Sequence, residues 1–386
     1  MMSGNSLLIT TSALVGFALA DDKSLATLPL AAQFIATMLT SIPAAMLMER
    51  IGRKPGFMLA TLLGLAGGVV ATLAILEGDF WLFLLGTVLF GSFNGFGNYY
   101  RFAAADAVDV DHKSRAVSYV MAGGVVAAVV GPNLALLTRE SIEGALFAGS
   151  YASMIVIYML ALLTLSFIKL PPKHVVAIGS DAARPLRVIA SQPKFIVALL
   201  GAMLGYAVMS LVMTATPLAM HDHNHAFADT SFVIQWHVLG MFAPSFFTGH
   251  LIKRFHVLNV MFVGALLGVA CIVINLLGTS LWHFWTALLL LGISWNFLFI
   301  GGTTLLTETY QPNERAKTQA LNDFTVFTTV SIAILSAGAL QHHLGWEVVN
   351  IGALPMLAVV MLSIIWVRYK NVDNVSDRFA VDEGEA

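Results

Sequence analysis

Long apolar stretches recur along the whole 386-residue chain, and they constrain its fold more than any other feature. Each runs for roughly 18–25 residues, which is long enough for a helix to cross a bilayer core of about 30 Å. The alternation of polar and apolar residues that membrane-spanning strands require is absent, so we expect helices. The stretches are centred near residues 12, 37, 67, 92, 127, 157, 207, 241, 267, 293, 329 and 357.

The composition excludes a water-soluble fold for this pattern. Hydrophobic residues make up 58% of the chain and charged residues only 11%, which leaves too little polar surface to cover a soluble globule. The sequence therefore predicts an all-α membrane protein with twelve transmembrane helices. The first stretch ends in Ala18-Leu19-Ala20, a pattern that signal peptidases cut. No Lys or Arg precedes it, so we interpret it as a retained helix.

Basic residues are distributed unevenly between the two sets of loops. One set holds 17 Lys and Arg residues, whereas the opposite set holds only Lys23 and Arg139. Since cytoplasmic loops are rich in Lys and Arg, we expect both termini to be cytoplasmic in a multi-pass protein of the cell's inner membrane. The net charge of −2 gives no sign of a nucleic-acid partner, and the lipid bilayer is the expected environment. The single cysteine, Cys271, excludes an internal disulfide.

A polar segment with several prolines divides the chain into two related halves. We expect a six-helix bundle at residues 1–169, a cytoplasmic linker at 170–194, a second six-helix bundle at 195–368 and a cytoplasmic tail at 369–386. AMLMERIGRKPG, which starts at residue 45, has a counterpart in GHLIKRFH about 204 positions later, and GSFNGF at 91 matches GISWNF at 292. A repeat of this length indicates a transporter whose site lies between the halves.

The loop LMERIGRK resembles the loop signature of the major facilitator superfamily. Arg50, Gly52, Arg53 and Lys54 match that signature, and Glu49 stands where the family usually has Asp. A short turn needs a glycine, and the charged groups suit contacts with helix ends. The resemblance implies the major facilitator fold, with two pseudo-symmetric six-helix bundles, and a role for this loop as a conformational gate.

Two pairs of side chains with a spacing of four residues favour a metal ion as cargo. Met209 and Met213 share one face of the seventh predicted helix, and His237 and Met241 share one face of the eighth, at matched depths of about 10 and 16 Å. Thioethers favour Cu(I), imidazole is compatible with it, and the thiolate or carboxylate that zinc prefers is missing. An ionisable residue within a membrane is usually functional. The alternative is that the methionines only fill space in the core.

The segments MSLVM and HVLGM are also similar to the paired motifs of the CcoA-like copper importers, a branch of the same superfamily. This resemblance implies that the four side chains bind copper as Cu(I), which then enters the cytoplasm by alternating access. The copper would supply the assembly of haem-copper oxidases, with a cytoplasmic copper acceptor as a partner. Copper is then the transported substrate, and no permanently bound cofactor is expected.

Histidines are concentrated in the loops predicted to lie outside the cell. The segment HDHNHAFAD carries His221, His223 and His225, and QHHLGWE carries His342 and His343. Histidines at alternate positions of an extended segment face the same way and are able to gather a metal ion at the outer mouth. A solvated loop explains them equally well, and the sequence leaves both interpretations open.

Polar and aromatic residues in the fourth and tenth predicted helices favour a different cargo. Such a lining suits a planar organic solute, for example a vitamin, held by stacking and hydrogen bonds. The candidate residues are Asn94, Asn98, Tyr99, Arg101, Trp295 and Asn296. A metal-binding sensor or assembly scaffold is a third interpretation. No catalytic constellation is evident, so an enzyme is not expected. Asp106 and Asp323 are the candidate proton carriers.

Overall fold

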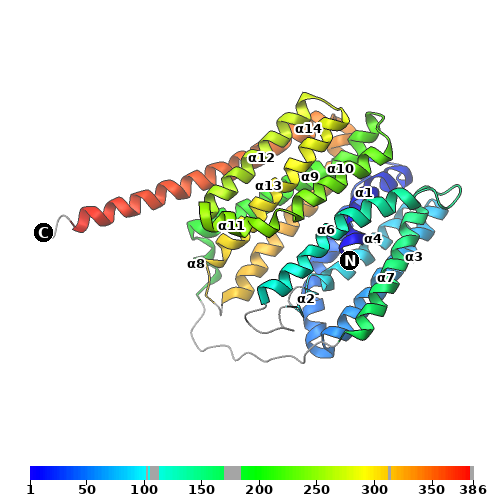
Figure 1. The fold of residues 1–386 in the computed structure, drawn as a ribbon, viewed down its shortest axis with the longest axis horizontal. Coiled ribbons are helices and arrows are strands. Elements are labelled where there is room, and N and C mark those ends of the chain that lie inside the picture. The colour runs from blue at the N-terminus through cyan, green and yellow to red at the C-terminus, as the bar shows by residue number, and fades with distance from the viewer. Residues whose placement is uncertain (101–102, 105–112, 169–183, 312–313, 383–386) are drawn as a thin grey trace.

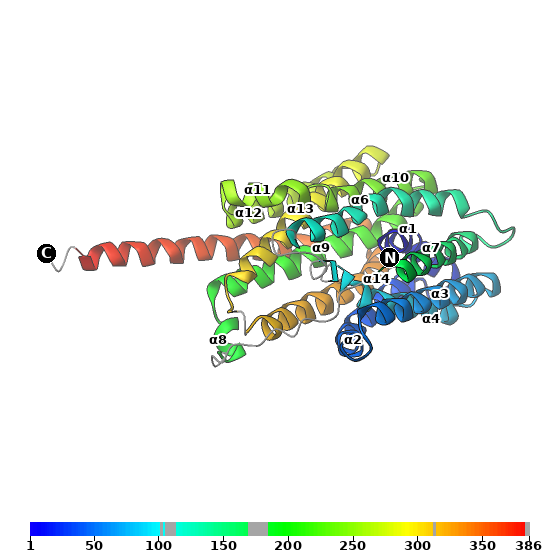
Figure 2. The same ribbon diagram turned by 60° about the horizontal axis from the view of Figure 1, so that its bottom comes forward.

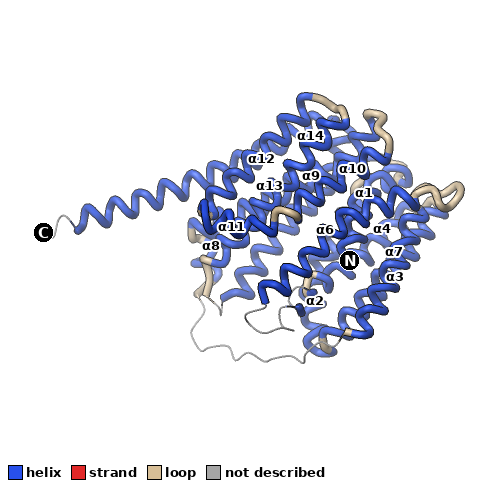
Figure 3. The backbone as a smooth tube through the Cα atoms, in the orientation of Figure 1, coloured by secondary structure: helices blue, strands red, loops and turns tan. Residues whose placement is uncertain are grey.

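The computed structural model describes residues 1–100, 103–104, 113–168, 184–311 and 314–382, and within them the regular structure is entirely helical (Figure 3). The first half of the chain contains α1 (Met2–Leu19), the short 3-10 helix η1 (Lys23–Leu25), α2 (Leu28–Ile51), α3 (Arg53–Glu77), α4 (Phe80–Gly97), α6 (Lys113–Thr138) and α7 (Ala148–Phe167). The second half contains α8 (Leu186–Ala190), α9 (Pro193–Asp222), α10 (Phe227–Phe242), α11 (Ser245–Phe255), α12 (Val257–Leu277), α13 (Leu281–Thr307) and α14 (Arg315–Asp382).

Each of the predicted apolar centres falls inside one of these helices. Helix α14 contains two of the centres, and its backbone breaks between them at Gly345 (φ 81°, ψ 177°). Within the described ranges, nine helices are long and apolar enough to cross a membrane by length and composition. The all-helical architecture is therefore confirmed, whereas the count of twelve crossings stays a prediction.

Local signals in the sequence determine where the helices begin and end. The Asp79 side chain accepts hydrogen bonds from the backbone N–H groups of Trp81 and Leu82 at 2.8 and 3.0 Å, which caps the first turn of α4. Just before it, Gly78 ends α3 in the left-handed conformation, with φ 71°. Pro193 occupies the first turn of α9, where its missing N–H costs no helical hydrogen bond.

The helices form two groups that lie side by side, one from each half of the chain (Figures 1 and 2). One hydrophobic core consists of residues from the first half, and a larger core consists almost entirely of residues from the second. Between the groups, α1 packs on α9, α2 on α14 and α6 on α10. Beyond the second group, α14 continues as a helix to Asp382 and projects past the bundle (Figure 1). Most of the predicted linker lies outside the described residues.

The internal repeat is visible in the backbone as well as in the sequence. Gly52 forms the one-residue junction between α2 and α3 with φ 90° and ψ 159°. His256, about 204 positions later, joins α11 to α12 with φ 67° and ψ 146°. The two halves therefore make the same sharp turn at equivalent residues, although only one of them has a glycine there.

Hydrogen bonds join the two halves near the end that carries the loop between α1 and α2. The Thr27 hydroxyl, at the start of α2, donates to the backbone oxygen of Ile334 in α14 at 2.8 Å and accepts from the backbone N–H of Gly338 at 3.1 Å. On the other side of the interface, the Ser231 hydroxyl of α10 donates to the backbone oxygen of Pro132 in α6 at 2.8 Å. These hydrogen bonds link the two halves directly at this end of the interface.

Candidate functional site

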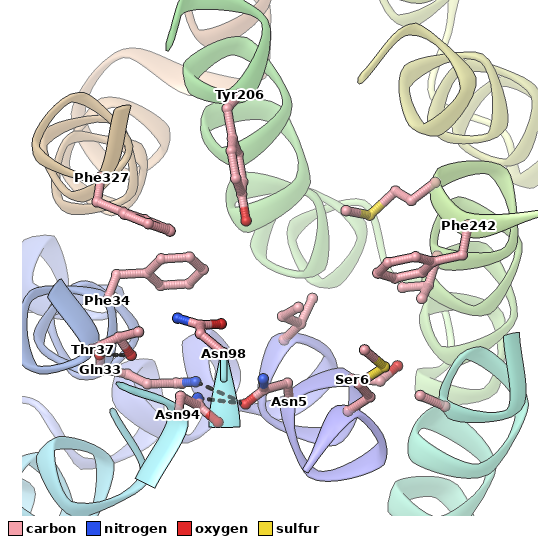
Figure 4. Close-up of a pocket in the computed structure, with 15 residues that line it drawn as sticks. Asn5, Ser6, Gln33, Phe34, Thr37, Asn94, Asn98, Tyr206, Phe242 and Phe327 are labelled. Atoms are coloured by element: carbon pink, nitrogen blue, oxygen red, sulfur yellow. Dashed lines mark hydrogen bonds between the residues drawn. The ribbon is translucent and has the colours of Figure 1, made fainter. Parts of the chain in front are cut away.

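A cavity lies between the two groups of helices, with walls from α1, α2, α4 and α6 on one side and α9, α10 and α14 on the other (Figure 4). The cavity has a volume of about 190 Å³, and part of it is continuous with solvent. Its lining consists of Met2, Asn5, Ser6, Ile9, Gln33, Phe34, Thr37, Asn94, Asn98, Ala127, Tyr206, Val238, Met241, Phe242 and Phe327.

The first half of the chain supplies the polar wall. Asn5 of α1, Gln33 of α2 and Asn94 of α4 bring their side-chain amides together, and Figure 4 shows the bonds that join them. The Asn5 oxygen accepts from Gln33 Nε2 at 3.2 Å and from Asn94 Nδ2 at 2.7 Å. Asn98 lies one turn after Asn94 and so shares its face of α4.

Aromatic rings cover the remaining walls. Phe34 of α2, Phe327 of α14, Tyr206 of α9 and Phe242 of α10 surround the space opposite the amides (Figure 4). Trp295 of α13 supports two of these rings from behind, with ring centroids 5.3 Å from Tyr206 and 6.1 Å from Phe242 in edge-to-face geometry. Such rings offer flat apolar surfaces against which a planar ligand can stack.

The chemistry of the cavity follows from these two walls. All fifteen lining residues carry uncharged side chains. Neutral amides recognise a ligand through hydrogen bonds, and aromatic rings bind an extended apolar surface. The arrangement therefore suits a neutral, planar ligand with a polar edge.

The four predicted copper ligands lie in the second half, and Met241 alone lines the cavity. Met209, Met213 and His237 are at most 2% exposed within the packed core of that half. His237 Nδ1 is 2.8 Å from the backbone oxygen of Leu288 in α13, and its Nε2 has no partner among the described residues. Because α13 packs against both α9 and α10, the two predicted pairs have it as a common neighbour. Copper binding by these side chains stays a prediction.

The histidines of the predicted outer loop are not brought together. The His221 ring lies 6.0 Å from the Phe17 ring, His223 Nδ1 contacts the backbone oxygen of Ala219, and His225 Nε2 contacts that of Thr279. Within the described part of the chain, no group of three or more His, Cys, Asp and Glu side chains is arranged to hold a metal ion. Metal capture by this loop stays a prediction.

The loop that carries the superfamily signature forms the expected sharp turn at Gly52, whose positive φ of 90° is readily adopted by glycine. Lys54 Nζ donates to the backbone oxygen of Ser166 at 2.7 Å, which ties this loop to the end of α7. Arg50 is exposed, and Arg53 follows the turn as the first residue of α3. The side chain of Glu49 lies outside the described part. The role of the loop as a gate stays a prediction.

The residues predicted for an organic solute divide into two groups. Asn94 and Asn98 line the cavity, and Trp295 lies directly behind it. Tyr99 and Asn296 have structural contacts instead: the Tyr99 hydroxyl donates to the backbone oxygen of Ser41 at 3.0 Å, and Asn296 donates to that of Met241 at 2.6 Å. Two further predicted residues, Arg101 and Asp106, lie outside the described residues.

The sequence analysis did not identify Asn5, Gln33, Phe34, Tyr206, Phe242 or Phe327. Asn5 and Gln33 did carry a signal, because each places a side-chain amide inside an apolar helix, and polar residues within a membrane usually have a function. The aromatic residues carried none, since Phe and Tyr are common in packed helices.

The internal repeat relates the amide cluster to the predicted copper ligands. NSLLITTSAL (5–14) aligns with MSLVMTATPL (209–218), so Asn5 corresponds to Met209. The same spacing of about 204 relates Gln33 to His237, and their backbone positions agree. A Cβ added at Gly91 would lie 2.2 Å from the Gln33 oxygen, and one at the matching Gly292 would lie 2.4 Å from the His237 oxygen. Equivalent positions therefore face the cavity in one half and the packed core in the other.

Comparisons with known proteins find matches that extend over most of the chain. The sequence profile of the Major Facilitator Superfamily matches residues 1–299 and 198–383. The chain is 43% identical over 365 residues to the riboflavin transporter RfnT of Brucella anthropi, an alignment that covers 94% of this chain and 92% of that protein. It is 25% identical over 377 residues to the uncharacterized MFS-type transporter YddS of Bacillus subtilis, covering 93% of this chain and 86% of the relative.

Proposed function

The chain belongs to the major facilitator superfamily, and from this premise we propose that it transports riboflavin, or a flavin with the same ring system, through the cavity between its halves. The observation that carries the proposal is the division of the cavity into an amide wall and an aromatic wall. The 43% identity to a riboflavin transporter over nearly the whole chain supports the same cargo.

Riboflavin matches both walls in chemical terms. Its tricyclic ring is flat and neutral, with a dimethylbenzene end that is apolar and a pyrimidine end that carries an imide. Stacking on Tyr206, Phe242 or Phe327 suits the apolar end, and the amides of Asn5, Gln33 and Asn94 suit the polar end. The hydroxylated ribityl chain adds further hydrogen-bonding groups that a partly open cavity accommodates.

Copper import is the weaker proposal for this chain. One of its four expected ligands lines the cavity, and the other three are buried in the core of the second half. The unpartnered Nε2 of His237 is the observation that favours it, since a buried imidazole nitrogen without a hydrogen bond is able to bind a metal ion. The relative with 43% identity favours a vitamin as cargo instead.

Inward transport across the inner membrane, with both termini in the cytoplasm, belongs to the same proposal. The uneven distribution of Lys and Arg between the two sets of loops supports the orientation of the termini. Alternating access agrees with a cavity that lies between two bundles and with hydrogen bonds between the halves at Thr27 and Ser231.

Uptake of radiolabelled riboflavin tests the proposal. We expect bacteria that require riboflavin to accumulate the label when they produce this chain. Membrane vesicles that contain the chain should also accumulate it, whereas a sensor or scaffold would not cause accumulation. Asn94→Leu should lower uptake strongly, whereas Met209→Leu, which conserves volume in the core, should leave it within about twofold of the parent. Parallel assays with radioactive copper complete the design. Copper uptake that depends on Met209, without riboflavin uptake by the parent, would reverse the assignment.

A further inference from the structure

Three side-chain amides from three different helices meet at a single oxygen atom. Asn5 Oδ1 accepts one hydrogen bond from Gln33 and one from Asn94, so both neighbours point their amino groups at it. Gln33 is 4% exposed and Asn94 is 6% exposed, although both lie in helices that cross an apolar environment. We name Asn5, Gln33 and Asn94 the amide triad.

The internal bonds of the triad leave a defined set of groups for a ligand. Gln33 Oε1 and Asn94 Oδ1 are buried acceptors without a hydrogen-bond partner among the described residues. The oxygen of Asn5 makes both internal bonds, which leaves its amino group as a donor. Unpartnered amide oxygens inside a membrane protein are costly, and they are expected to be satisfied by a ligand or by water. The triad, whose three residues line the cavity, therefore has two buried acceptors without partners and one donor group for a ligand to satisfy.

A cyclic imide complements such a set. Its N–H lies between two carbonyl groups, so a donor and an acceptor stand next to each other on one edge. We propose that the amide triad is the specificity-determining subsite of the cavity and binds the imide edge of a flavin. The imide N–H donates to a carbonyl of Gln33 or Asn94, and an imide carbonyl accepts from the Asn5 amino group. This inference rests on the proposed transport of riboflavin.

The internal repeat gives the bound ring a direction. At the positions equivalent to the amide triad, the second half has Met209, His237 and Trp295, none of which offers a primary amide. Only the first half is thus able to hold the imide in this way. The dimethylbenzene end then points toward Tyr206 and Phe242 of the second half, and the ring bridges both halves.

A flavin methylated on its imide nitrogen tests the subsite directly. Binding to the purified protein is measured by quenching of flavin fluorescence, for riboflavin and for the methylated analogue. Methylation removes the N–H and leaves a buried acceptor unpartnered, so the parent protein should bind the analogue about tenfold more weakly or worse. The ratio of the two dissociation constants is the quantity that decides.

Variants of the triad should abolish this discrimination. Gln33→Met and Asn94→Leu remove the amide groups with little change in volume, so the ratio should fall toward one as riboflavin binding weakens. Met209→Leu, at the position equivalent to Asn5, is the matched control and should keep the parent ratio. General damage to the fold weakens both flavins alike and does not move the ratio.

The outcomes separate this inference from the proposed function. Equal binding of the two flavins by the parent would overturn the imide subsite and leave riboflavin transport standing. The imide subsite would also be overturned if the parent bound the methylated flavin normally but failed to bind a flavin without the ribityl chain. The triad would then bind the hydroxyl groups of that chain. Failure of the parent to bind either flavin would refute the proposed function, and the subsite with it.

Discussion

Equivalent residues of the two halves share a backbone conformation that suits one residue type better than the other. Gly52 and His256 occupy equivalent junctions, and both have a positive φ together with an extended ψ. Glycine adopts this region freely, whereas a residue with a Cβ is strained there. The exposed His256 side chain therefore carries a backbone cost that its counterpart in the first half avoids.

Replacing this histidine should stabilise the protein. His256→Gly relieves strain of about 1–3 kcal/mol and gives back about 0.5–1 kcal/mol through the greater freedom of the unfolded chain. We expect a net gain of roughly 1 kcal/mol, visible as a rise of a few degrees in the Tm of the purified protein. His256→Ala retains the Cβ and should leave the Tm unchanged. A similar rise in both variants would attribute the effect to loss of the imidazole.

Helix faces were predictable from the sequence at this scale, but their neighbours were not. The spacing of four residues correctly places His237 and Met241 on one face of α10. It does not say that α13 packs on that face and covers His237. Conversely, Asn5 and Gln33 lie on different helices, and their amides meet only because α1, α2 and α4 converge in the fold. Their cluster could not be read from spacing along one helix.

At the scale of elements, one hydroxyl group links the start of α2 to the backbone of α14. Thr27 Oγ1 bonds to two backbone groups of α14, and α14 approaches so closely at Gly338 that an added Cβ would lie 2.7 Å from this oxygen. Two helices from different halves are joined here without any charged group. A substitution that removes the hydroxyl and keeps the shape of the side chain therefore distinguishes the role of these hydrogen bonds from the role of packing.

Thr27→Val should make this end of the interface open more often. The substitution conserves shape and removes hydrogen bonds worth about 1 kcal/mol each, which corresponds to a change of roughly fivefold or more in the closed-to-open ratio. We call the contact between Thr27 and α14 the seam. A cysteine introduced at Ala13, which is 1% exposed and lies next to the seam, should then react faster with a membrane-impermeant maleimide. The native Cys271 is fully buried and adds little background.

A threonine that bonds only within its own helix provides the comparison. Thr72 donates to the backbone oxygen of Gly68 at 2.7 Å, so Thr72→Val should leave the labelling of the cysteine at position 13 unchanged. Equal labelling in the Thr27 and Thr72 variants would show that the hydroxyl of Thr27 does not hold the seam.

A second junction ties the segment before α8 to the start of α14. The fully buried Glu314 carboxylate accepts from the Arg184 backbone N–H at 2.7 Å and from its guanidinium at 2.8 and 2.6 Å. These bonds, helped by the Gln311 backbone N–H, lower the pKa of Glu314 to about 2. Because the folded pKa lies below the usual value of 4.5, the contribution of this pair to stability is present above about pH 4.5 and declines only as the pH falls toward 2.

Limited proteolysis checks this junction. Trypsin should cut slowly after Arg187. After correction for the pH dependence of trypsin itself, the rate of this cut should be the same from about pH 5 to 8. Glu314→Gln should accelerate the cut several-fold, because it leaves Arg184 with weaker partners. Glu308→Gln removes the exposed pair with Lys194 and should have little effect, since such pairs contribute little. Slow cleavage in both variants would show that the bonds between Arg184 and Glu314 do not hold this segment in place.

At the scale of the whole molecule, the uncharged cavity between the two bundles predicts which flavins the proposed transporter carries. Riboflavin has no charge, whereas flavin mononucleotide carries a phosphate that would enter a space whose fifteen described lining residues include no cation. Burial of an unpaired charge is strongly unfavourable. We expect the mononucleotide to compete with riboflavin for the purified protein at least about 100-fold more weakly.

Lumiflavin, which has the ring but neither phosphate nor ribityl chain, is the appropriate control in this competition. The concentration of lumiflavin that displaces half of the labelled riboflavin should lie within about tenfold of the concentration of unlabelled riboflavin that does so. If flavin mononucleotide displaced riboflavin as well as the vitamin itself does, a cation would have to face the ligand, and the neutral character of the site would be refuted.

The alignment of the amide triad with Met209, His237 and Trp295 has a consequence for how this architecture changes its cargo. One copy of the repeat contributes the three amides of the triad to the cavity, and the other contributes the rings of Tyr206, Phe242 and Phe327. On the proposed function, substitutions at Asn5, Gln33 and Asn94 should alter selectivity while the contact at Thr27 and the turns at Gly52 and His256 stay as they are. For protein engineering, a small library of variants at these three positions in the first half is therefore enough to search for a new cargo, and the rest of the fold is kept unchanged.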